Sequence, residues 1–171
     1  GGVTSYFDMP NNKPQTTTRE ALAHKKEIAK SDSIENYSFF FGATADNMAE
    51  IKQLDPRYVC GVKVFMGAST GNMLVDNKNA LYDIFSGTTL PIVTHCENTE
   101  IINRNARRIH SLYGDEADIS FHPVIRSEEA CFESTELAVN LAKQTGAKLH
   151  VAHISTAKEL SLFDAHSEKI T

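Results

Sequence analysis

A lysine in the middle of an apolar run is the residue with the clearest chemical potential in this chain. Residues 61–67 read Gly-Val-Lys-Val-Phe-Met-Gly, which is typical of a parallel strand buried on both faces. An unpaired ammonium there costs several kcal/mol, so burial favours the neutral amine of Lys63. A neutral amine reacts with carbon dioxide to form a carbamate, which can bridge two metal ions. The alternative is that Lys63 extends from a strand end or pairs with a carboxylate.

Histidines lie near the ends of two later apolar runs. His95 is the penultimate residue of the run 90–96, and His150 and His153 lie in the run 148–154. Residues three apart on a strand point to opposite faces, so only one of the latter two is expected at a common site. His153 is nearer the carboxyl end and is the better candidate, whereas His150 is expected to pack or hydrogen-bond in the wall. Two imidazoles and a carbamate oxygen form an incomplete zinc environment, and a hydrogen-bonded core role for His95 stays open.

Other chemistries have weaker support. There is no Gly-x-Ser-x-Gly elbow for a serine nucleophile, and Cys96 beside His95 is a poorly specified alternative because strand neighbours face opposite ways. The glycine-containing stretch 67–72 lacks the Gly-Lys-Ser/Thr ending of a phosphate-binding P-loop. No Gly-x-Gly-x-x-G motif follows the first predicted strand, so a dinucleotide site is not expected.

Composition excludes several classes of partner. The chain has 171 residues, 41% of them hydrophobic, and a net charge of -5, which argues against nucleic-acid binding. No apolar run approaches the roughly 20 residues of a membrane span, and no signal peptide opens the sequence. The odd number of cysteines indicates reduced thiols of a cytoplasmic protein; these are Cys60, Cys96 and Cys131.

The chain alternates predicted strands with predicted helices. Strands are expected at residues 3–9, 37–42, 61–67, 90–96 and 148–154, and a further strand could begin at 169–171. Helices are expected at residues 17–30, 45–54, 79–85, 97–110, from Ser127 to Thr145, and at 156–167, with an irregular connection at 115–125. The predicted N-caps are Thr17 (with Glu20 in a capping box), Thr44, Ser127 and Ser155, and Gly146 is the predicted stop after Thr145.

This alternation predicts right-handed βαβ units around a parallel sheet. An open doubly wound sheet and a (β/α)8 barrel both fit the pattern, and both place sites at the carboxyl ends of the strands. The residues of interest lie at or near those ends; they are Asn11, Lys63, His95 and His153.

Four stretches together resemble the cyclic amidohydrolases, and specifically the dihydroorotases. They are residues 1–4 with Asp8-Met9-Pro10-Asn11, the run 62–67, Thr94-His95-Cys96-Glu97, and residues 150–155 (His-Val-Ala-His-Ile-Ser). They occur in the family's order over nearly the whole chain. The loop here reads Met-Pro-Asn-Asn where the family usually has Met-Pro-Asn-Thr. Allantoinases are the nearer alternatives, and hydantoinases generally lack the Met-Pro-Asn loop.

The resemblance implies a (β/α)8 barrel with a zinc site, usually binuclear, on which water opens dihydroorotate reversibly to N-carbamoyl-L-aspartate in pyrimidine synthesis. Lys63 would be the carboxylated bridging ligand, His95 and His153 would bind one metal, and Asn11 would hold the substrate's carboxylate. The resemblance implies a small-molecule substrate as the binding partner, and neither nucleic acid nor a membrane. A homo-oligomer is compatible with the family.

Part of the family's machinery is expected outside these residues. The His-x-His of the first barrel strand and the general-base aspartate of the last are not found here, and a full barrel needs around 250 residues. We therefore expect residues 1–171 to be an internal part of a single catalytic barrel domain, holding about strands 2–6, and to be inactive alone. A metal-free amidohydrolase-like scaffold and an unrelated flavodoxin-like or Rossmann module are the alternatives from other classes.

Overall fold

Five parallel strands form the centre of the molecule. The computed structural model describes residues 1–67 and 73–171, so most of the glycine-containing stretch 67–72 lies outside the described residues. The strands are β1 (Ser5–Asp8), β2 (Asn36–Gly42), β3 (Gly61–Phe65), β4 (Ile92–His95) and β5 (Leu149–Val151). Each predicted strand is therefore present, although β5 is shorter than the apolar run that predicts it.

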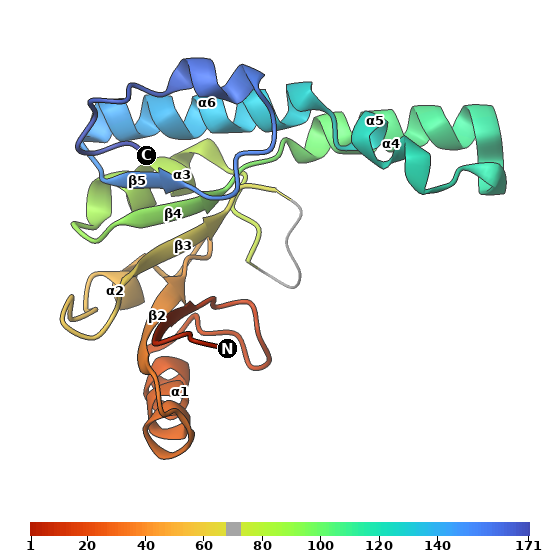
Figure 1. The fold of residues 1–171 in the computed structure, drawn as a ribbon. Helices are drawn as coiled ribbons and strands as arrows, with labels where there is room; N and C mark the ends of the chain where they lie inside the picture. Colours follow the sequence, from red (N-terminus) through yellow and green to blue (C-terminus); the bar gives the residue numbers. More distant parts are fainter. Residues whose placement is uncertain (68–72) are drawn as a thin grey trace.

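The strand order distinguishes the two predicted architectures. The strands pair in the sequence order β1-β2-β3-β4-β5, and every pair is parallel. A doubly wound sheet reverses its strand order at a switch point, whereas a (β/α)8 barrel does not. The chain therefore has an α/β fold and forms part of a (β/α)8 barrel, with its two termini near opposite edges of the sheet (Figure 1).

An α-helix follows each strand except the last, which a short 3₁₀ helix follows. The α-helices are α1 (Arg19–Asp32), α2 (Met48–Ile51), α3 (Lys78–Gly87), α4 (Thr99–Tyr113), α5 (His122–Ile125) and α6 (Glu128–Thr145). Short 3₁₀ helices lie at η1 (Gly114–Glu116), η2 (Ile119–Phe121) and η3 (Lys158–Leu162). None of the helices in the described residues is long and apolar enough to cross a membrane.

Some predicted helix ends are confirmed and others are wrong. Ser127 caps α6 by accepting a hydrogen bond from the amide of Ala130, and Gly146 ends α6 with a φ of 75°. The cap of α1 is Thr18 rather than Thr17. Thr44 does not cap a helix, because its hydroxyl donates to Asp46 instead and α2 begins only at Met48.

Two further boundary corrections bear on the site. The predicted helix 97–110 begins later, with Asn98 as its N-cap, so Glu97 lies in the connection between β4 and α4. The predicted helix 156–167 is only the 3₁₀ helix η3, and Ser155 donates to the carbonyl of His153 rather than capping it. The segment after it returns to the sheet, where Ile170 forms a parallel bridge with Leu149, as the predicted further strand requires.

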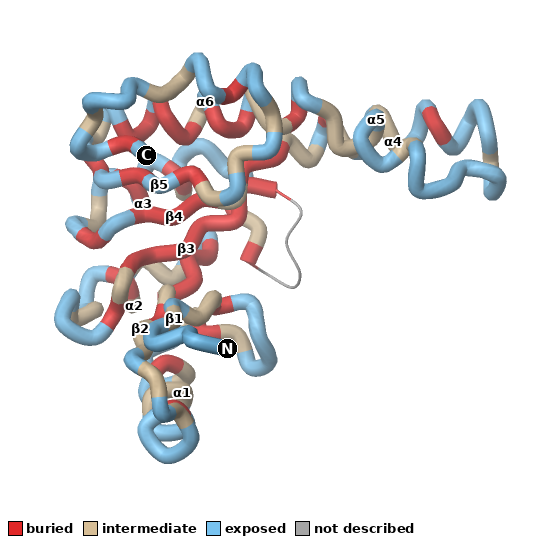
Figure 2. The backbone as a smooth tube through the Cα atoms, viewed as in Figure 1, coloured by how far each residue is buried: buried red, intermediate tan, exposed pale blue. Residues whose placement is uncertain are grey.

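The two faces of the sheet differ in chemistry. Val62, Val64 and Ile92 belong to one buried cluster with residues of α3 and α6, which places this face against the helices. Side chains alternate along a strand, so the aligned residues Lys63, Val93 and His150 share the other face. Figure 2 shows that β3 and β4 are the most continuously buried part of the chain, and that α4 and α5 project away from the sheet as an exposed arm.

Candidate active site at the carboxyl ends of the strands

The structure brings His95 and His153 into contact. His95 is the last residue of β4, and β5 ends at Val151, so the chain has left the strand before His153. His153 has a φ of 46°, a left-handed conformation that non-glycine residues adopt uncommonly. This turn, rather than strand alternation, directs the ring, and His153 Nε2 lies 3.1 Å from His95 Nδ1. His150 lies apart from this pair, with its Nδ1 3.0 Å from the Thr171 hydroxyl oxygen.

Lys63 lies on the same face, deep in the sheet. Its exposed fraction is 3%, and among the described residues its Nζ has no hydrogen-bond partner. The Nζ lies 4.7 Å from the centroid of the Phe65 ring, which in turn is 6.1 Å from the His95 ring centroid. Burial lowers the pKa of Lys63 to about 8, with Cys96 acting weakly in the opposite direction.

The ring of His153 favours its neutral form. Partial burial and then the neighbouring His95 lower the pKa of His153, and Lys63 acts in the same direction. A histidine must be neutral to bind a metal ion, and these surroundings favour the neutral form.

Glu97 and Arg126 complete the site, and sequence reasoning gave neither of them a role. Glu97 Oε2 accepts a hydrogen bond of 2.8 Å from His95 Nε2, and Oε1 accepts one of 2.7 Å from Arg126 Nε. Arg126 Nη2 also pairs with Glu97 Oε2. Burial alone would raise the pKa of Glu97, but the hydrogen bonds from His95 and Arg126 hold it at about 2. The sequence signals for Glu97 were its position two residues after His95 and its place in the stretch Thr94-His95-Cys96-Glu97 that carries the resemblance; nothing indicated Arg126.

Gly67 allows the end of β3 to lie directly against Glu97. A Cβ at this position would overlap the backbone carbonyl of Glu97. Met66 donates from its backbone amide to the carbonyl of His95 at 2.9 Å, so the two strand ends stay paired up to this point. The glycine that ends the lysine run is therefore required by the close approach of two backbones.

A cavity of about 610 Å³ opens beside the paired histidines. Its lining includes His95, Glu97, Arg126 and His153. Asn11 lies elsewhere, in the exposed loop that follows β1 at the same carboxyl edge of the sheet. The described residues contain no group of three His, Cys, Asp or Glu side chains arranged to hold a metal ion. A metal here would need Lys63 beside the two histidines, so the predicted ligand and substrate roles remain predictions.

Sequence comparison gives relatives along almost the whole chain. An allantoinase from Desulfitobacterium hafniense is 32% identical over 167 residues, which are 95% of this chain and 37% of the relative. A dihydroorotase from Methanosphaera stadtmanae is 28% identical over 171 residues, which are 99% of this chain and 38% of the relative. No family model matches the chain.

Structural comparison points the same way. The L-hydantoinase (dihydropyrimidinase) from Arthrobacter aurescens superposes with a TM-score of 0.88 at 28% identity, over 95% of this chain and 36% of that one. These matches support the cyclic amidohydrolase family. The predicted partial barrel and the predicted relation to hydrolases of cyclic amides are thus supported. The relatives are an allantoinase, a dihydroorotase and a hydantoinase, so they do not distinguish dihydroorotase from the other two activities. The chain spans little more than a third of the length of the relatives it matches.

Proposed function

We propose that residues 1–171 form part of the single catalytic barrel domain of a zinc-dependent cyclic amidohydrolase. The observation that carries the proposal is the buried amine of Lys63, which lacks a hydrogen-bond partner in the described residues and shares a sheet face with His95. A lysine in such a position is costly unless it acquires a partner. A metal site that Lys63 enters as its carbamate supplies that partner.

The donor atoms present fit such a site. The pKa of Lys63 at about 8 leaves an appreciable neutral fraction at physiological pH, which is the form that carbon dioxide carboxylates. His95 Nδ1 and His153 Nε2 already face one another, so both rings could bind one ion with little rearrangement. Carboxylated Lys63 would hold two zinc ions, and His95 and His153 would be ligands of one of them. Zinc would activate water and polarise the ring amide carbonyl.

The substrate assignment rests on the loop after β1. We propose dihydroorotate, which carries a carboxylate, because Asn11 lies exposed at the carboxyl edge and its amide can donate to that group. Allantoin and hydantoins are the alternative rings, favoured by the allantoinase and hydantoinase among the relatives. The three free cysteines favour a reducing compartment such as the cytoplasm.

The proposal is tested on the whole protein, with Lys63→Ala as the comparison. We expect about two zinc ions per chain, and we expect Lys63→Ala to lose metal together with turnover by at least about 1,000-fold. A metal-free parent without turnover of any cyclic amide would overturn the proposal. Assays on dihydroorotate, allantoin and hydantoin in parallel decide the ring.

Asn11→Ala separates the ring substrates further. We expect KM for dihydroorotate to rise at least about tenfold, because one charge-assisted hydrogen bond is lost, while KM for unsubstituted hydantoin stays the same. Asn12→Ala is the matched control, because Asn12 ties the loop to Asp8 of β1 and Lys25 of α1 and reports damage to the loop itself. Equal effects of both variants on both substrates would remove Asn11 from the substrate site.

A further inference from the structure

The carboxylate of Glu97 is held on both sides. The Glu97 side chain is 8% exposed, and its two oxygens accept hydrogen bonds from Arg126 and from His95 Nε2. The backbone of Glu97 is fixed against Gly67, where no side chain would fit. Glu97 belongs to no helix or strand, so these contacts set its position.

The contact with Glu97 decides which nitrogen of His95 carries a proton. An ionised carboxylate only accepts hydrogen bonds, so the neutral ring must carry its proton on Nε2. The lone pair is then on Nδ1, which is the atom that faces His153 Nε2 at 3.1 Å. Arg126 contacts both carboxylate oxygens of Glu97, through its Nε and its Nη2, and this paired cation favours the ionised form of the carboxylate.

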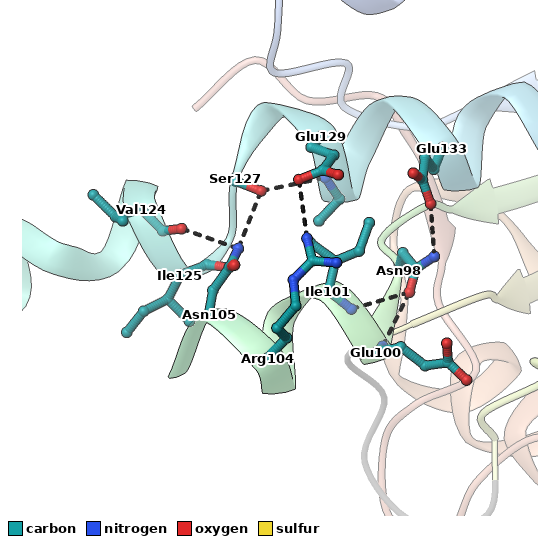
Figure 3. A network of polar contacts seen from close by, with 11 residues as sticks. Asn98, Glu100, Ile101, Arg104, Asn105, Val124, Ile125, Ser127, Glu129 and Glu133 are labelled. Atoms are coloured by element: carbon teal, nitrogen blue, oxygen red, sulfur yellow. Dashed lines mark hydrogen bonds and ion pairs between the residues drawn. The ribbon is translucent and has the colours of Figure 1, made fainter. Parts of the chain in front are cut away.

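Arg126 is in turn held by the junction between α5 and α6. The side-chain amide of Asn105 on α4 donates to the carbonyls of Val124 and Ile125, both at 3.2 Å (Figure 3). It also contacts the hydroxyl of Ser127, the N-cap of α6, at 3.3 Å. Both residues that flank Arg126 in sequence are therefore anchored to α4.

We propose that Glu97, oriented by Arg126, is a positioning residue that keeps His95 in its Nε2–H tautomer with Nδ1 directed at the metal ion. This inference rests on the proposed metal site and assigns roles to two residues outside its ligand set. Second-sphere carboxylates of this kind orient a histidine ligand and increase its basicity.

The test is Glu97→Gln in the full chain, with Glu129→Gln as the matched control. Glutamine keeps the shape of the side chain, but its amide can also donate, so it no longer selects the Nε2–H tautomer. Glu129 pairs with Arg104 on the exposed surface and lies outside the site. The readouts are the ¹⁵N chemical shifts of the His95 ring in metal-free protein and zinc affinity by chelator competition.

We expect Glu97→Gln to give a mixture of His95 tautomers and a zinc affinity about 10- to 100-fold lower, and Glu129→Gln to match wild type. A Glu97→Gln variant with the wild-type tautomer and zinc affinity would overturn the inference while leaving the metal site intact. If wild type binds no zinc, the proposed function fails, and the tautomer in metal-free protein still decides the role of Glu97.

A second variant covers the case in which Glu97→Gln does not fold. Arg126→Lys keeps the positive charge but loses the two-point contact with Glu97. We expect a smaller loss of zinc affinity, about threefold to tenfold, with partial loss of the Nε2–H tautomer. A wild-type zinc affinity and a wild-type His95 tautomer in Arg126→Lys would contradict the role of Arg126.

Discussion

Ion pairs at the carboxyl ends of the strands are more buried than an ion pair on the outer helices. On the outside, Arg104 and Glu129 pair at 3.1 Å with 59% and 54% of their side chains exposed. At the strand ends, the same two residue types pair as Arg126 and Glu97 with 35% and 8% exposed. Water solvates Arg104 and Glu129 whether or not they pair, so their ion pair adds little stability. Water reaches Glu97 poorly, so removing Glu97 or Arg126 would leave the other charge without either a partner or full hydration.

The lysines show the same contrast. Lys25 lies 2.6 Å from Asp8 and also donates to the carbonyl of Met9. Lys63 has no such partner in the described part of the chain, although it is the more buried of the two. Lys25 is therefore stabilised by contacts within the structure, whereas burial of Lys63 penalises its charged form.

The largest expected effect comes from Lys63→Met. In metal-free protein at pH 7, we expect the free energy of unfolding to rise by about 3 kcal/mol, because each unit of pKa depression corresponds to about 1.4 kcal/mol of cost for the buried charge. Turnover by the whole protein should be lost in the same variant. Denaturant unfolding checks the rise in stability, and activity assays check the loss of turnover. The control is Lys25→Met, which breaks an ion pair and should lower stability.

The gain in unfolding free energy from Lys63→Met should depend on pH between the folded and unfolded pKa values of Lys63. The pKa of Lys63 falls from 10.5 to about 8 on folding, so between these values the unfolded chain binds more protons than the folded one. The stability of metal-free wild type therefore rises across this window, and the difference from Lys63→Met narrows as pH increases. A difference that stays constant from pH 7 to 10.5 would show that Lys63 is not desolvated.

Gly67→Ala is expected to have the next largest effect. Its Cβ would overlap a backbone carbonyl of Glu97, which cannot move without disturbing the ends of β3 and β4, so we expect a loss of about 2–3 kcal/mol. Gly87→Ala is the control, because a Cβ there meets the flexible end of Met48. Thermal unfolding of the two variants should differ clearly; equal midpoints would contradict the close approach.

Glu97→Gln should cost about 2 kcal/mol at pH 7, because Arg126 is left without its charged partner. The pKa of Glu97 is lowered from 4.5 to about 2, so its contribution is present above about pH 4.5 and is lost as the pH falls toward 2. Wild type and variant should therefore converge in stability in acid. Urea unfolding at pH 7, 4 and 3 measures this convergence.

The smallest effect is expected for the exposed pair. Arg104→Met and Glu129→Gln should each change the free energy of unfolding by less than about 0.5 kcal/mol, and added salt should reduce even that. A loss above 1 kcal/mol in either variant would erase the distinction between the outer helices and the strand ends.

Most of the elements follow from local chemistry, but several ends do not. The cap of α1 is one of three successive threonines, and Thr16 is buried with its carbonyl accepting from Gly42, so packing selects Thr18. The helix expected after Ser155 is replaced by a 3₁₀ turn around Glu159. The buried carboxylate of Glu159 accepts hydrogen bonds from the hydroxyls of Thr135 and Thr156. Thr135 lies 24 residues away, so no local pattern reveals this contact.

The sequence by itself determined the alternation of strands and helices, the apolar run around Lys63 and the histidines near the ends of later strands, because these depend on neighbours along the chain. Only the tertiary structure decided that the strands pair in sequence order, that a turn at His153 brings its ring to His95, and that Arg126 reaches Glu97. Each of these depends on contacts between residues far apart in sequence. Such contacts exist only once the backbone has folded, and composition and spacing carry no record of them.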